Sequence, residues 1–339
     1  MRALRAGASA MVLLGIDVSK GRLDCALLAD EGGRPLGRRA FPNDAGGAEQ
    51  AASWTARASG AAAADTHVIL EATAAYHEPA ARQLAALGMR VSVVNPAQVR
   101  SFAKGLGILG KTDRIDARLL ARYGQLVRPK AWQPPAEAVA DLQALVARLD
   151  DVEADLRREE SRLEQARTRG CPGVVEQSLL ESIAALKSRR RSLRRAIVAH
   201  TAAHDGLQAD LERLLTIPAV GPKTATRMLA LLRARGFESA RQVAAYLGLV
   251  PVERQSGKSV RGRPRLSRAG NPRLRAALYM AAVVGIRRNP DIKAQYERLL
   301  EAGKCKMAAL GAAMRKLVHL CFGVLKGGSD YRAGVATPA

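Results

Sequence analysis

The sequence predicts an α/β domain followed by a longer, mostly helical region. Three segments at residues 12–18, 22–29 and 34–41 have the composition of strands in a meander, and helices alternate with strands after them. This order is typical of a mixed layer fold, in which helices cover a sheet. After a proline-rich segment at residues 128–135, apolar residues recur every three or four positions, which is the period of helices.

The α/β domain is expected to span residues 11–127, with the proline-rich segment as its boundary. Helices and two further strands are predicted after the meander, the helices at 45–58, 76–87, 97–104 and 113–124 and the strands at 66–71 and 90–94.

A coiled-coil pair of long helices is predicted at residues 136–205. Leucine, isoleucine and valine follow heptad-like spacing on both sides of a Gly-Cys-Pro-Gly turn at residues 170–173. The same pattern suits a hairpin folded on itself and an arm that pairs with a second chain, and the sequence leaves both open.

The remaining domain is expected at residues 207–326. Helices are predicted at 271–288, 291–301 and 304–325, with one long polar loop at 251–270. The segment after Gly327 has the composition of an unstructured tail.

The charge of the chain points to a polyanionic partner. Lys and Arg number 54 against 31 Asp and Glu, which gives a net charge of +23, and so basic a chain usually meets nucleic acid. No run of 18 apolar residues is present, and the four cysteines have no metal-ligand spacing. A reduced protein of the cytoplasm, without a membrane span, is expected.

Four carboxylates are the first candidates for chemistry. Asp17 ends the apolar run of the first strand, Glu71 ends the fourth strand, and Asp113 and Asp116 share one face of a helix start. Such a cluster is costly unless cations neutralise it, and Mg²⁺ prefers these oxygen ligands and supports phosphoryl transfer. The alternative is structural, with Asp113 capping the helix and Asp116 paired to a neighbouring arginine.

The segment TIPAVGPKTA, at residues 216–225, resembles a helix–hairpin–helix element. Its turn ends at Gly221 and opens a helix that carries Lys223, and the N–H groups of such a helix start can hold a DNA phosphate. The alternative is an ordinary connection between helices.

Further basic residues are candidate phosphate contacts, although a charged run is often only a solvated face. They comprise Lys111 and Arg114 beside the aspartate pair, Lys187, Arg189, Arg190 and Arg191 on the second long helix, and Lys258, Arg261, Arg263 and Arg265 in the polar loop.

The polar loop also carries Ser256, Ser259 and Ser267. A serine becomes a nucleophile only when a base, a metal or fixed cations activate it. No Ser-His-Asp pattern surrounds these serines, so chemistry alone favours a loop that only binds phosphate.

Several separated motifs occur in a characteristic order: GIDVSKGRLDCALL, EATAAYHEPAARQL, KTDRIDARLLARY, LLTIPAVGPKTA and GLVPVERQSG. Together they closely resemble the DEDD-type transposases of the one-hundred-ten family of bacterial insertion sequences, relatives of the Piv DNA invertase. The resemblance covers about residues 12–325.

The resemblance implies an N-terminal RuvC-like domain of RNase H fold, a coiled coil and a C-terminal transposase domain. Its four acidic positions match Asp17, Glu71, Asp113 and Asp116, and its catalytic serine matches Ser256. It also implies Mg²⁺, donor and target DNA, a bridge RNA that pairs with both, and a dimer or tetramer with a composite site. The family often has glycine where this chain has Ala219, and only glycine adopts positive φ without strain.

An RNA-guided recombinase is therefore the expected function. A metal-dependent nuclease or junction resolvase without serine chemistry, and a non-catalytic nucleic-acid-binding protein, are the alternatives.

Overall fold

The computed structural model describes residues 11–73, 75–108, 113–256, 260–267 and 269–334, and of residues 113–115, 253–256 and 260–264 it describes the backbone alone. The chain divides into two compact units, one ending at Pro134 and the other beginning at Pro135. A mixed α/β unit is followed by a mostly helical one, which confirms the predicted fold class at this level.

A five-stranded sheet in the order β3-β2-β1-β4-β5 forms the centre of the first unit. The strands are β1 (Val12–Val18), β2 (Arg22–Ala29), β3 (Pro35–Pro42), β4 (Thr66–Glu71) and β5 (Arg90–Val94). β1, β2 and β3 pair as an antiparallel meander, whereas β1, β4 and β5 are parallel. The central strands are buried on both faces, which is why they appear in the sequence as continuous apolar runs.

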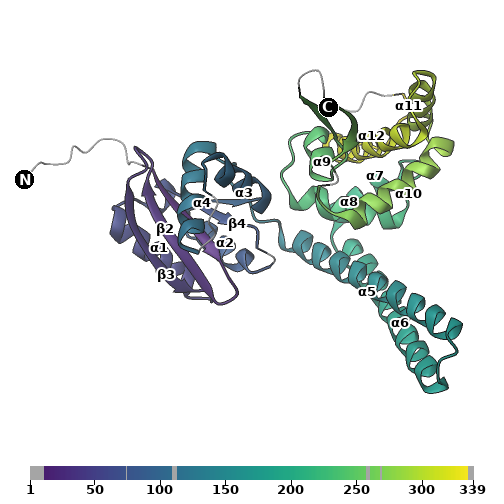
Figure 1. Cartoon of the computed structure of the whole chain (residues 1–339), viewed down its shortest axis with the longest axis horizontal. Coiled ribbons are helices and arrows are strands. Elements are labelled where there is room, and N and C mark those ends of the chain that lie inside the picture. The colour runs from purple at the N-terminus through teal and green to yellow at the C-terminus, as the bar shows by residue number, and fades with distance from the viewer. Residues whose placement is uncertain (1–10, 74, 109–112, 257–259, 268, 335–339) are drawn as a thin grey trace, which may run out of the picture. The chain divides into compact units, whose positions relative to one another are not determined.

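Helices cover both faces of this sheet (Figure 1). α1 (Gly47–Ser59) and α2 (His77–Ala86) pack on the face that carries Leu14, Ile16 and Leu70. A short 3₁₀ helix, η1 (Ala63–Asp65), lies between α1 and β4. α3 (Pro96–Gly105) and α4 (Asp113–Val127) pack on the other face against Leu13 and Ile69.

Helix α4 lies unusually close to β1 because Gly15 has no side chain. A Cβ at Gly15 would overlap the carbonyl oxygen of Ala117 and the amide nitrogen of Ala121. Gly124 makes a similar close approach to Ile69. The helix is thereby held directly over the two central strands.

The second unit begins with a helical hairpin. α5 (Glu137–Thr168) and α6 (Gly173–Ala202) pack against each other along their length, through an apolar cluster that includes Val152, Leu156 and Ile183. The hairpin is therefore folded on itself within the chain, and pairing with a second chain stays a prediction.

Six further helices and a β-hairpin complete this unit (Figure 1). They are α7 (Asp205–Leu215), α8 (Pro222–Ala234), α9 (Ala240–Tyr246), β6 (Pro251–Ser256), β7 (Val260–Leu266), α10 (Pro272–Arg288), α11 (Pro290–Glu301) and α12 (Lys306–Gly327).

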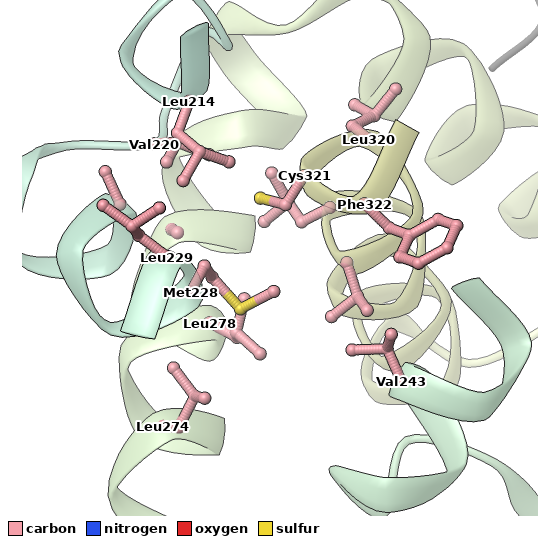
Figure 2. Packing of buried hydrophobic residues seen from close by; sticks show 14 of the residues in the cluster. Leu214, Val220, Met228, Leu229, Val243, Leu274, Leu278, Leu320, Cys321 and Phe322 are labelled. Atoms are coloured by element: carbon pink, nitrogen blue, oxygen red, sulfur yellow. The ribbon is translucent and has the colours of Figure 1, made fainter. Parts of the chain in front are cut away.

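Helix α12 is the centre of the helical core. Figure 2 shows Cys321 of α12 on the side that faces Met228 and Leu229 of α8, within a cluster that also includes Leu214, Val220, Val243, Leu274, Leu278, Leu320 and Phe322. Among the described residues, α12 is the one helix long and apolar enough to cross a membrane, and 72% of its apolar window is buried inside this unit. Packing within the core accounts for its composition.

The predicted polar loop at residues 251–270 is wrong, because β6 and β7 form an antiparallel hairpin there. Its strands carry few apolar side chains, so they lack the alternation that marks a strand. Backbone pairing holds the hairpin, and Leu266 anchors its end against the helical core.

The predicted tail after Gly327 is also wrong as far as Gly334. The hydroxyl of Tyr331 donates to Asp291 at 2.8 Å, and its backbone N–H donates to Thr216 at 2.9 Å. These hydrogen bonds to α11 and to the turn after α7 order the short polar segment.

The turn between α7 and α8 contains a strained alanine. Ala219 has φ of +81°, and Val220 N–H donates to Ile217 O at 3.0 Å across Pro218, as in a turn that favours glycine at its third position. Left-handed backbone costs an L-residue about 1–2 kcal/mol.

Ala219→Gly is therefore expected to stabilise the protein by about 0.5–1 kcal/mol, after subtraction of the extra freedom of glycine in the unfolded chain. Thermal unfolding measures the gain. Ala276→Gly, at an exposed position inside α10, is the matched control and should destabilise by about 1 kcal/mol. A lower melting temperature for Ala219→Gly would contradict the strain.

Candidate active site and nucleic-acid contacts

Asp17 and Glu71 lie beside each other at the ends of two paired strands. The parallel register of β1 and β4 runs from Val12–Thr66 to Ile16–Leu70, and these two carboxylates are the next residues on their strands. Alternation along the strand places Asp17 on the face of Leu13 and Gly15, and Glu71 on the face of Ile69. Both are half-buried and lie on the face that α4 covers.

The N-terminal end of α4 brings the third carboxylate to the same end of the sheet. Ala117 contacts Gly15, two residues before Asp17 on β1, and Asp116 directly precedes Ala117. Asp116 is half-buried. Asp113 begins α4, one turn earlier, and its side chain is outside the described part of the structure.

The backbone positions bring these carboxylates to one end of the sheet. Across the described residues, no three His, Cys, Asp or Glu side chains are gathered closely enough to hold a metal ion. Clustered carboxylates repel one another unless a cation neutralises them, so a cation is the ligand that this set of positions would suit.

Asp24 is a fifth carboxylate beside this site, and the sequence did not single it out. It is the direct cross-strand partner of Asp17 in the β1–β2 register, and it is only 7% exposed. The Arg22 guanidinium donates to it at 2.7 Å. The signal was present in the sequence, because a short hairpin at Ser19–Gly21 sets residues 17 and 24 opposite each other, but no register had been assigned.

Asn43 is a second residue that the sequence analysis missed. Its side-chain amide donates to Ser19 O at 2.8 Å and to Tyr76 O at 3.1 Å. One amide thereby connects the loop after Asp17 with the loop after Glu71. Only the tertiary structure brings these three segments together.

Ser256 is the last residue of β6 and pairs with Val260 of β7. The described structure gives its backbone and not its side chain. Ser259, Lys258 and Lys111 lie outside the described residues, as do the side chains of Arg114, Arg261 and Arg263. Arg265 is exposed on β7, opposite Val252.

Lys223, a candidate phosphate contact, takes part in an ion-pair network at the base of the helical hairpin. Its ammonium donates to Glu153 at 2.6 Å, and Arg194 of α6 donates to the same carboxylate at 2.9 Å. Arg227 of α8 pairs with Asp150 and lies 3.4 Å from Glu153. The Lys223 side chain remains half-exposed, so it can also contact a phosphate bound beside Gly221.

The cations of the network keep Glu153 in its charged form. Burial alone would raise the pKa of Glu153, but the hydrogen bonds from Lys223 and Arg194 outweigh burial and lower it. A carboxyl whose pKa falls on folding adds stability above its ordinary pKa, and this stability is lost as the pH drops through the lowered value.

Removing the central cation should be strongly destabilising. Arg227 is 7% exposed, and Arg227→Met would leave Asp150 and Glu153 buried with less compensation. We expect a loss of about 3–5 kcal/mol in the free energy of unfolding, measured by denaturant titration. Arg273→Met, which breaks the exposed pair with Asp151, is the control and should cost at most about 1 kcal/mol. Equal losses in the two variants would contradict the role of burial.

The basic run on α6 faces mostly outward. Arg189 and Arg191 are exposed and Arg190 is half-buried. Lys187 lies 3.5 Å from Glu160 of α5. Lys187 thus pairs with the other helix of the hairpin, and phosphate contact by the arginines of the run stays a prediction.

An α/β unit with carboxylates at adjacent strand ends, followed by a basic helical unit, has the construction of an enzyme that acts on nucleic acid. Two transposase family models match the chain. A DEDD transposase model of IS110 matches residues 14–172, and the model described as Transposase IS116/IS110/IS902 family matches residues 211–297.

Curated proteins are similar over nearly the whole chain. The pilin gene-inverting proteins of Moraxella lacunata and Moraxella bovis are each 31% identical over 315 residues, which is 92% of this chain and 95% of theirs. A probable family 20 transposase of Pseudomonas aeruginosa is 27% identical over 302 residues, covering 75% of this chain and 82% of its own.

The chain therefore belongs to the IS110 family of transposases and DNA invertases. DNA is the substrate that this family implies, and DEDD transposases typically use a divalent metal ion. The first family model includes all four acidic positions, and the second includes the α7–α8 turn and Ser256.

Proposed function

We propose that this protein is an RNA-guided DNA recombinase that excises and inserts an insertion sequence. Its N-terminal unit is then a RuvC-like domain, and its catalytic residues are Asp17, Glu71, Asp113, Asp116 and Ser256. The observation that supports this best is the placement of Asp17 and Glu71 at the ends of paired strands, under the start of the helix that carries the aspartate pair.

The carboxylates suit a hard divalent cation, and we assign them to Mg²⁺. Their donor atoms are all oxygens, and those that the structure describes are half-buried rather than sealed from solvent. When bound, Mg²⁺ supplies charge stabilisation for the phosphate oxygens during transfer. The fifth carboxylate, Asp24, is paired with Arg22 at 2.7 Å, and we do not assign it to the metal.

We assign Ser256 the role of nucleophile. Its Oγ loses its proton and forms a bond to phosphorus while the bond from phosphorus to the sugar oxygen breaks, and that oxygen takes up a proton. The phosphoserine is later attacked by a sugar hydroxyl of another strand, which restores the serine and joins the DNA. By analogy with the family, we assign the carboxylates of one subunit and the serine of another to one composite site, in a dimer or tetramer.

Guidance by a bridge RNA explains the charge and composition of the surface. If base pairing reads the sequence, the protein needs mainly contacts to phosphate backbones. A net charge of +23 with 4% aromatic residues suits such contacts. Lys223 at the start of α8 and the arginines of α6 are assigned to them.

A circle-junction assay in bacteria tests the proposal. The gene is carried with its native flanking DNA, and amplification across the joined ends reports excision. Joined ends that depend on an RNA transcribed from the flanking DNA support the proposal. Cleavage of DNA by the purified protein without any joined ends would instead identify a nuclease that uses the carboxylates alone.

A further inference from the structure

Arg38 and Arg39 are neighbours on the edge strand β3 and lie on opposite faces of the sheet. Arg38 is opposite Ala26, which is itself opposite Gly15, so Arg38 shares the face of Asp17 and α4. Arg39 is opposite Cys25 and lies over the ring of Phe41, 5.5 Å from its centre, on the other face. Both arginines are exposed.

Helix α4 adds two arginines to the face of Arg38. The Arg122 guanidinium lies next to Gly33, so this flank of α4 reaches the β2–β3 turn. Arg118 precedes Arg122 by one helical turn and follows the same flank. Both are exposed.

Two nearby carboxylates, Asp24 and Asp30, are paired with arginines other than these three. Asp24 is paired with Arg22 at 2.7 Å, and Asp30 with Arg128 at 2.9 Å. Within the described residues, Arg38, Arg118 and Arg122 form no ion pair with a carboxylate, and Arg122 donates to the neutral side chain of Gln125. These three arginines therefore add positive charge along the face that carries Asp17, from the β2–β3 turn beside Arg122 toward the carboxylate end of the sheet.

We propose that Arg38, Arg118 and Arg122 form a track for the backbone of DNA that leads to the carboxylate site. The proposal rests on the proposed function and adds the path of the substrate. Strand geometry puts the backbone of Arg38 roughly 12 Å from that of Asp17, or about three to four nucleotides along one strand. Carboxylates repel DNA, so cations on the same face are needed to hold a strand there.

The neighbouring arginines provide a matched test. Full-length Arg38→Gln and Arg39→Gln lose the same charge on the same strand, and each is titrated with a short fluorescent DNA duplex of random sequence over a range of salt concentrations. We expect Arg38→Gln to weaken binding several-fold and to lower the slope of log affinity against log salt by about one, as for one lost phosphate contact. Arg39→Gln should bind like the wild type.

Combining Arg38→Gln with Arg118→Gln and Arg122→Gln should lower the slope by about two to three. If the wild type binds and Arg38→Gln and Arg39→Gln are indistinguishable, the track is wrong while the recombinase proposal stands. If the wild type does not bind the duplex at low salt, the track is wrong, whereas the recombinase proposal is decided by the circle-junction assay. Far-ultraviolet circular dichroism of each variant shows that the fold is kept.

Discussion

Ser256→Ala is expected to lower the yield of joined DNA ends by about a thousandfold or more, while affinity for DNA stays at the wild-type value. Alanine removes the oxygen that forms the phosphoserine, and loss of a nucleophile costs most of the rate enhancement of an enzyme. The side chain carries no charge, so its removal leaves the electrostatic part of binding unchanged. The circle-junction assay measures the first quantity and a DNA titration measures the second.

Ser267→Ala is the matched control, since Ser267 is exposed just beyond the same hairpin, and it should recombine normally. Ser259→Ala separates the two candidate nucleophiles of the hairpin region. Joined ends at the wild-type level from Ser256→Ala, together with their loss in Ser259→Ala, would move the nucleophile to Ser259. The purified protein is incubated with DNA and run on a denaturing gel. A covalent adduct should appear for every form of the protein except the variant that lacks the nucleophilic serine.

Asp17→Asn should lower recombination by about a hundredfold or more. The amide keeps the shape of the side chain but is a poor ligand for a hard cation, and lost stabilisation of several kcal/mol corresponds to this factor. DNA affinity should be unchanged or slightly higher in the absence of metal, because one negative charge beside the DNA has been removed. Asp116→Asn should behave in the same way.

The control for these variants is Glu49→Gln, an exposed carboxylate in the first turn of α1, on the opposite face of the sheet. It makes the same change of charge and should recombine like the wild type. Isothermal titration with Mg²⁺ adds a readout that does not depend on activity: binding that is lost in Asp17→Asn and kept in Glu49→Gln supports the assignment. Loss of DNA binding by Asp17→Asn would show that Asp17 has a structural role instead.

Local sequence patterns were sufficient for most of the elements. The buried strands β1 and β4 are continuous apolar runs, and the long helices α5 and α6 repeat their apolar residues every three or four positions. These signals depend on neighbours along the chain, so no tertiary information is needed to see them. The β6–β7 hairpin had no such signal, because its strands are held by backbone pairing rather than by apolar side chains.

The candidate residues of the site were recognisable as motifs, but their arrangement was not. A shift of one residue in strand register moves every side chain to the other face. The short hairpin at Ser19–Gly21 was a signal for Asp24 opposite Asp17, but the sequence could not tell that Arg38 and Arg39 face different ways.

The amino-acid sequence alone was enough to predict the α/β and helical regions, the basic character and the family motifs, since each depends on residues that are close along the chain. The tertiary structure decided which distant groups meet: Gly15 with α4, Asn43 with two loops, and Arg227 with Asp150. The reason is physical. Periodicity and propensity act between neighbours, whereas register and close packing are set by the energy of the whole fold.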